Sequence, residues 1–86
     1  MTRLDLWCPQ PVSGLRLFEL EDGAILQDPA RRKIHSLNPW ATVVWLLCNG
    51  HRSAQEIVAL VAPGDEPFRR AIIALLASLQ REGLVQ

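Results

Sequence analysis

Few side chains in this sequence have the type and spacing that catalysis or metal binding requires. The two histidines, His35 and His51, are too scattered for a zinc site, which needs about four ligands at local spacing. The two cysteines, Cys8 and Cys48, lie in no motif that would supply a general base and an oxyanion site. Two reduced thiols, one buried on a helix, are favoured over a disulfide bond. The sequence therefore predicts a protein that is not an enzyme and that uses no metal or cofactor.

The side chains that could serve recognition are basic and clustered. Arg31, Arg32 and Lys33 are consecutive, and Arg69 and Arg70 lie near the start of the last predicted helix. The whole chain has 9 basic and 9 acidic residues, so its formal net charge is zero. This balance disfavours a strongly basic nucleic-acid binder. Local positive charge instead suits an acidic partner. Taken alone, the run of Arg31, Arg32 and Lys33 would also fit a solvated turn and a strand edge that its charges protect from unwanted pairing.

The length and composition of the chain limit the kind of fold that can hold these basic residues. The 86 residues suffice for one small domain, and 49% hydrophobic with 21% charged residues is a globular composition. No apolar run reaches the roughly 18 residues that a membrane span needs, and the first residues do not form a signal peptide. We therefore expect a cytoplasmic protein. Residues 1–14, with Pro9, Pro11 and Gly14, are expected to form a loosely held arm, and residues 15–86 the domain.

Three short strands are predicted between residues 15 and 37. Residues 15–20 alternate in polarity, Gly23 favours a tight hairpin turn, and residues 24–27 form the returning strand. Pro29 suits the next turn, and residues 31–37 form the third strand. The third strand carries many charges, so we expect it at an edge of the sheet, where charges deter uncontrolled pairing.

The pattern then changes to a helical period. Asn38 caps the first helix, and Gly50 stops it. Ser53 and Glu56 form the capping box of the second helix, and the third helix covers about residues 66–82. One apolar face of each helix is expected in the core: Ala41, Val44, Trp45 and Cys48 in the first, Ile57, Leu60 and Val61 in the second, and Phe68, Ile72, Leu75 and Leu79 in the third.

A second stripe on the last helix lies about 90° round from the first. It consists of Arg69, Ile73, Leu76 and Gln80. Either the helix touches both the sheet and another helix, or this flank lines a groove. The order of three antiparallel strands and three helices, two of them joined by a tight glycine turn, predicts an α+β fold similar to a winged helix-turn-helix.

Several segments, in order, resemble the PqqD-like peptide chaperones, also called RiPP recognition elements, over residues 15–85. The matching segments are Asp28-Pro29-Ala30-Arg31 and Ile34 to Asn38, then Ala41, Val44, Leu47 and Asn49-Gly50, then Ser53 with Glu56-Ile57, and finally Leu75, Leu79 and Gly83-Leu84-Val85. Asn49 replaces the usual aspartate of the family. The turn at Pro29 differs from the Pro-Glu-Gly turn of members that serve pyrroloquinoline quinone synthesis, so the resemblance does not imply that pathway.

This resemblance implies a non-catalytic domain that binds the leader segment of a ribosomally made precursor peptide. The leader would add as a strand beside the third strand and lie against the third helix. The domain would then present the peptide to a radical-SAM, ATP-grasp or protease enzyme, as a monomer or a dimer. Strand addition is chemically reasonable, because an edge strand has unpaired backbone groups. The expected peptide-binding residues are Arg31, Arg32, Lys33, Ile34, His35, Ser36, Arg69, Ile73, Leu76 and Gln80.

Two other classes share the expected architecture. A DNA-binding winged helix needs basic residues on its recognition helix, and the candidate, residues 54–62, has none. A protein-interaction module would suit exposed Trp7 and Trp40, which would form an apolar patch for a partner to cover, whereas Trp45 is expected in the core.

Overall fold

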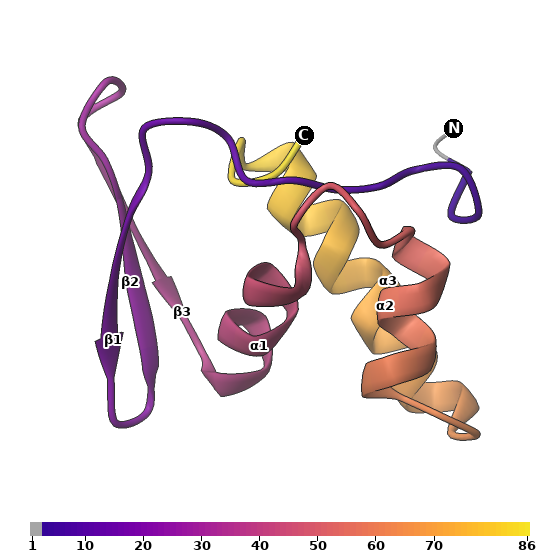
Figure 1. Ribbon diagram of the computed structural model, residues 1–86. Helices are drawn as coiled ribbons and strands as arrows, with labels where there is room; N and C mark the ends of the chain where they lie inside the picture. Colours follow the sequence, from indigo (N-terminus) through magenta and orange to yellow (C-terminus); the bar gives the residue numbers. More distant parts are fainter. Residues whose placement is uncertain (1–2) are drawn as a thin grey trace.

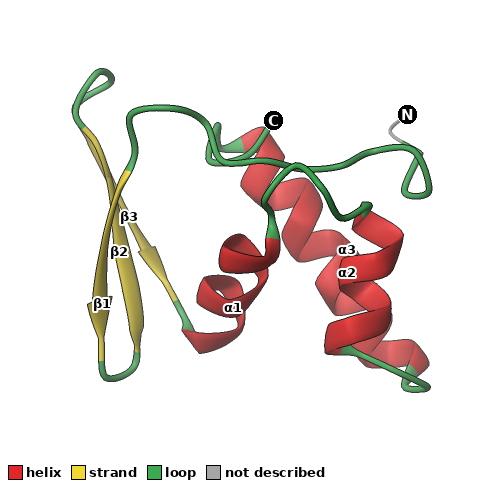
Figure 2. Ribbon diagram, viewed as in Figure 1, coloured by secondary structure: helices red, strands yellow, loops and turns green. Residues whose placement is uncertain are grey.

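Three antiparallel strands are followed by three helices in the structure, a computed structural model that describes residues 3–86 (Figures 1 and 2). The predicted α+β class and the order of its elements are confirmed. The elements are β1 (Arg16–Leu20), β2 (Gly23–Asp28), β3 (Lys33–Leu37), α1 (Pro39–Leu47), α2 (Ala54–Val61) and α3 (Glu66–Arg81).

The sheet has the order β1-β2-β3, which places β3 at an edge as predicted. Leu26 of β2 pairs with Leu17 on one side and His35 on the other, and this face is covered by the helices. Phe18 and Ile34 lie on the opposite face and are exposed. The strict alternation of buried and half-buried residues along β2 fits a sheet with one face on the core and one in water.

The third strand begins at Lys33, so the prediction that it starts at Arg31 is wrong by two residues. Arg31 and Arg32 belong to the turn between β2 and β3. The carboxylate of Asp28 accepts the N–H of Arg31 at 3.2 Å, and Pro29 accepts the N–H of Arg32 at 3.3 Å. Arg32 has φ 56°, a left-handed conformation that a strand residue cannot adopt. The hydrogen bonds of the turn therefore hold Arg31 and Arg32 outside the strand, and β3 starts at Lys33.

The predicted helix starts are confirmed atom by atom. The side chain of Asn38 accepts the N–H of Ala41 at 2.7 Å. Ser53 Oγ accepts the N–H of Glu56 at 3.1 Å, while Glu56 Oε1 accepts the N–H of Ser53 at 3.0 Å. These bonds satisfy backbone donors that have no partner within a helix.

The core differs from the predicted one in how two helices are rotated. On α2, Leu60 is 61% exposed and Val58 is buried in its place. On α3, Ile72, Leu76 and Leu79 are fully buried, whereas Phe68 and Leu75 are only half-buried. The buried face of α3 is thus turned by about 30° from the predicted stripe. The cause is that α3 packs against both α1 and α2; the sequence alternative of contact with the sheet and one helix is wrong, because no Cα atom of α3 lies within 8 Å of a Cα atom of the strands.

The N-terminal segment is not loosely held, which corrects the expectation for the described part of residues 1–14. Its carbonyls at Leu4 and Trp7 accept the N–H groups of Gln55 and Ala54 at 3.0 and 2.7 Å, which supplies acceptors to the first turn of α2. Gln10 exchanges two backbone bonds with Gln86, at 3.2 and 2.9 Å. The segment therefore crosses α2 and the C-terminus, and its described hydrogen bonds leave β3 untouched (Figure 1).

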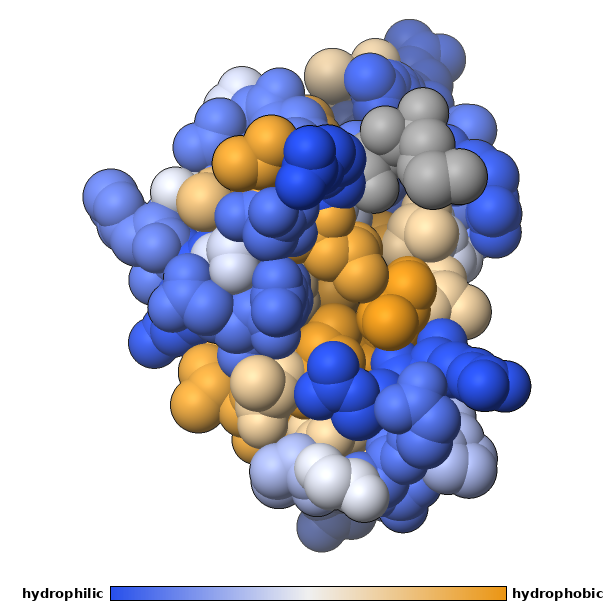
Figure 3. All heavy atoms as spheres, turned by 90° about the vertical axis from the view of Figure 1, so that its right-hand side faces the viewer, coloured by the Kyte–Doolittle hydropathy of each residue, from blue (hydrophilic) through white to orange (hydrophobic). Residues whose placement is uncertain are grey.

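The face formed by α2, α3 and the N-terminal segment has apolar atoms along its middle, framed by hydrophilic ones (Figure 3). Within residues 3–86, none of the helices combines the length and the apolar character that a membrane crossing requires.

Both cysteines are free thiols, as predicted. Cys8 is exposed, whereas Cys48, directly after α1, is buried and donates its S–H to the carbonyl of Val44 at 3.1 Å. Burial raises the pKa of Cys48 to about 12, because the thiolate would lose its hydration.

We therefore expect only one thiol per folded chain to react rapidly with Ellman's reagent near pH 8. The reactive species is the thiolate, which Cys48 cannot form while buried, whereas Cys8 is exposed to the reagent. In denaturant both thiols should react. Two fast-reacting thiols in the folded chain would contradict the burial of Cys48, and a Cys8→Ser variant should remove the fast phase.

Candidate functional site: the edge of β3

The open edge of β3 presents unpaired backbone groups. The carbonyl of Leu37 lies against Gly23 of β2. Alternate residues of a strand direct their N–H and C=O groups to opposite sides, so Ile34 and Ser36 turn theirs away from β2. β2 is the strand neighbour of β3 in the described sheet, and the other described backbone bonds do not use these groups. Ile34 and Ser36 thus offer two donors and two acceptors to solvent.

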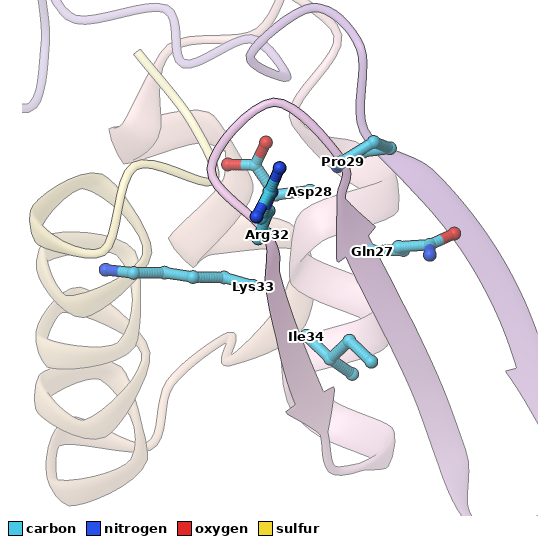
Figure 4. Close-up of a pocket in the computed structure, with 6 residues that line it drawn as sticks. All are labelled: Gln27, Asp28, Pro29, Arg32, Lys33 and Ile34. Atoms are coloured by element: carbon cyan, nitrogen blue, oxygen red, sulfur yellow. The ribbon is translucent and has the colours of Figure 1, made fainter.

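Helix α3 stands beside this edge without covering it. None of the Cα atoms of β3 comes within 8 Å of a Cα atom of α3. The carboxylate of Glu82, just after α3, reaches Nδ1 of His35 at 3.2 Å, and Lys33 extends toward the helix (Figure 4). The two elements are therefore connected by side chains, while the backbone of β3 is left unpaired.

Side chains of β3 divide between the two faces of the sheet. Ile34, 69% exposed, points to the outer face with Gln27, while Lys33 points the other way (Figure 4). His35 shares the inner face with Leu26, and its Nε2 is buried without a hydrogen-bond partner in the described part of the chain. A strand added at this edge would have a cationic side on the α3 face and an apolar side on the outer face.

A hollow of about 380 Å³ lies at the end of the edge, where β2 turns into β3 (Figure 4). It combines cationic, polar and apolar groups, which suits a peptide side chain better than a purely apolar ligand. Its lining consists of Gln27, Asp28, Pro29, Arg32, Lys33 and Ile34. Of these, only the last three were predicted as site residues. The sequence indicates a turn at Asp28-Pro29, but no local signal shows that this turn borders the open edge.

Arg31 serves the fold rather than the open edge. Its Nη1 lies 3.8 Å from Oδ2 of the buried Asp28. The same guanidinium lies so close to Gly83 that a Cβ atom there would collide with it. Gly83 follows the C-terminal end of α3, where a positive charge is favourable. Arg31 therefore ties the turn to the end of α3, and the expectation that it faces a peptide loses its support.

The structure does not gather the predicted cations in one patch. Arg69 and Arg70 lie 3.8 and 3.6 Å from the carboxylate of Glu66 at the start of α3. The C-terminal end of α3, which contacts His35, is about 20 Å away along the helix. The predicted basic residues thus form two separate groups beside α3, one at each end.

The predicted apolar flank of α3 is only partly accessible. Ile73 is half-buried and Gln80 is exposed, whereas Leu76 has 0% exposure and belongs to the core. Leu76 therefore cannot offer an open contact, which corrects the prediction that it lines a groove. Its burial follows from the rotation of α3 between α1 and α2.

The described residues form no cluster suited to a metal: no three or more His, Cys, Asp or Glu side chains come together in residues 3–86. The second helix of the pair that resembles a helix-turn-helix, α2, carries Glu56 and no basic residue. The electrostatic requirement for entry into a DNA groove is therefore not met by this helix.

Comparisons with known proteins agree with this architecture. A family model described as "Coenzyme PQQ synthesis protein D (PqqD)" matches residues 23–85. A solved structure described as "TbiB1 in Complex with the TbiA(beta) Leader Peptide" is similar to this chain with a TM-score of 0.71 and 16% sequence identity. The similarity covers 90% of this chain and 94% of that one. At this identity the likeness establishes the fold. A search of curated proteins finds no match.

Proposed function

The chain belongs to the PqqD family, and on that premise we propose that it binds the leader segment of a ribosomally made precursor peptide. The leader adds as a fourth strand at the open edge of β3 and lies beside α3. The domain has a binding role in this proposal and performs no chemistry on the peptide. It presents the bound peptide to a modifying or processing enzyme of the radical-SAM, ATP-grasp or protease type, in the cytoplasm.

The observation that carries the proposal is the unpaired backbone of Ile34 and Ser36 beside a helix that does not cover it. An extended peptide can bond to these groups whatever its sequence, so affinity comes from the main chain. The similar solved structure supports the proposal, because it is described as a complex with a leader peptide.

Specificity then comes from the side chains that border the edge. Lys33 and Arg32 are exposed and free of the ion pairs found in the described residues, so they favour an acidic leader. Ile34 adds an apolar contact on the outer face. Charges of this kind raise the association rate and fix the register of the added strand. Ordering the leader costs roughly 2–5 kcal/mol, so we expect moderate affinity.

The test is a titration of the ¹⁵N-labelled chain with a synthetic peptide. The peptides to test are the N-terminal segments encoded by any short reading frame next to the gene for this chain. The largest amide shifts are expected at Ile34 and Ser36, with smaller ones at Ile73 and Gln80 on α3. Saturable shifts confined to α2 would overturn strand addition, as would saturable binding that leaves the amides of Ile34 and Ser36 unshifted.

Reversing the charge of both Arg32 and Lys33 to glutamate is expected to weaken leader binding about tenfold at low salt. The melting temperature should hardly change, because both side chains are exposed. Arg16→Glu is the matched control, since Arg16 is also exposed but lies on β1, at the far edge of the sheet. Fluorescence anisotropy of a labelled leader measures the effect, and equal affinity of the double variant and the control would reject the role of edge charge.

A further inference from the structure

Helix α1 has an apolar surface on the side that faces away from the core. Its nine residues include no charged side chain, and eight of the nine are apolar. At 100° per residue, one arc of about 120° holds five of them. We call this the α1 arc; it consists of Pro39, Trp40, Val43, Leu46 and Leu47, of which Leu47 is half-buried and packs against the core at the border of the arc. The buried residues Ala41, Val44 and Trp45 lie on the opposite side of the helix.

The α1 arc is exposed where a surface helix normally carries polar groups. Trp40 is 51% exposed, Val43 43% and Leu46 49%. A helix that is apolar all round is typical of a fully buried position. Single exposed apolar residues are ordinary, but a contiguous set marks a surface that another molecule covers.

Neighbouring elements extend the α1 arc at both ends. Trp40 packs edge-to-face on Phe68 at the start of α3, with ring centroids 4.9 Å apart. Leu20, at the end of β1, is exposed and borders the same hollow as Val43 and Leu46. The apolar surface therefore runs from the β1–β2 hairpin across α1 to α3.

A hollow of about 300 Å³ lies between the β1–β2 hairpin and α1. It gives the surface a concave seat that can hold one or two side chains of a partner. Acidic groups stand at its hairpin side, and no basic residue is among those that line it. The lining residues are Glu19, Leu20, Glu21, Gly23, Pro39, Thr42, Val43 and Leu46.

We propose that the α1 arc and this hollow dock a helix of a second protein, apolar on one face and flanked by Lys or Arg. The charges decide between occupants. Two copies of this chain meeting here would bring two acidic hairpins to one contact without a cation from either hollow. A helix with basic flanks would instead pair with Glu19 and Glu21 while its apolar face covers the arc.

This docking surface is separate from the edge of β3 and does not depend on the proposed function. The arc begins at Pro39, two residues after β3 ends at Leu37. A protein docked on it would therefore lie next to one end of any strand added to β3. A peptide and a protein could then be held by one domain at the same time.

The experiment uses two synthetic probes, an amphipathic helical peptide of leucine and lysine and the same peptide with glutamate at every lysine. Chemical shifts of the labelled chain should show saturable binding of the lysine probe on α1 and the hairpin, with Ile34 and Ser36 unaffected. The glutamate probe should bind at least about tenfold more weakly. Equal affinity for both probes would overturn the charge argument.

Variants identify the surface. Val43→Glu should weaken binding of the lysine probe about tenfold or more. Leu46→Gln should have the same effect and serves as a second variant in case Val43→Glu folds poorly. Leu60→Glu is the control, because Leu60 is more exposed than Val43 and Leu46 but lies on α2, and it should leave binding unchanged. An equal loss with Leu60→Glu would refute the assignment. Sedimentation velocity completes the test, since a dimer that Val43→Glu dissociates would show that the occupant is a second copy and reject our proposal.

Discussion

Replacing Trp45 with alanine is expected to lower the free energy of unfolding by about 3–5 kcal/mol. Trp45 is buried on α1, and its Nε1 donates to the carbonyl of Leu84 at 3.1 Å. The variant loses the packing of a large ring and one of the two hydrogen bonds to this carbonyl, which keeps the N–H of Val12 at 3.3 Å. A domain of this size has a total stability of roughly 4–13 kcal/mol, so the loss is a large part of it.

Two further variants separate packing from the hydrogen bond. Trp45→Phe keeps most of the volume and should cost about 1–3 kcal/mol, for the lost hydrogen bond from Nε1 to Leu84 and the lost part of the ring. Trp40→Ala, on the exposed side of the same helix, should cost only about 1 kcal/mol, the value of its edge-to-face contact with Phe68. Urea unfolding followed by circular dichroism measures all three. A wild-type midpoint for Trp45→Ala would remove this residue from the core.

Proline at Ile34 should lower the affinity for the leader by at least about tenfold while the domain stays folded. The N–H of Ile34 points to the open edge, so its loss breaks no bond to β2, and proline is tolerated on an edge of this kind. A paired leader strand would lose that donor and meet the bulk of the ring. Binding is measured by calorimetry with the synthetic leader.

Matched variants make this prediction specific to the backbone. Ile34→Ala keeps the N–H and should bind within a few-fold of wild type. His35→Pro removes an N–H that points to β2 and should destabilise the fold itself. If Ile34→Pro folded and bound the leader as tightly as Ile34→Ala, strand addition at β3 would be rejected. A wild-type melting curve for His35→Pro would show that we have wrongly assigned which backbone groups of β3 point to β2 and which point to the open edge.

The elements of the fold were predictable because their signals are local. Asn38, Ser53 and Glu56 bond within three residues along the chain, so short-range sequence alone identifies the caps. The glycine at the β1–β2 turn and the charges of the third strand predicted a hairpin and an edge, and both are present. The resemblance to the PqqD-like chaperones rests on the same ordered segments, and the family match over residues 23–85 confirms it.

The composition of the site depends on contacts between residues far apart in the chain. Arg31 looked free in the sequence, but its guanidinium lies against Gly83 and pairs with Asp28. Leu76 looked like the wall of a groove, but the packing of α3 against both other helices turns it inward.

The sequence by itself therefore determined which segments are strands and helices, where the helices start, and that one strand of the sheet is charged and at an edge. Only the tertiary structure decided which faces of α2 and α3 are buried, and that the N-terminal segment pairs with the C-terminus. The reason is that a cap or a tight turn is stabilised by neighbours along the chain, whereas the rotation of a helix is set by the combined packing of every element that touches it.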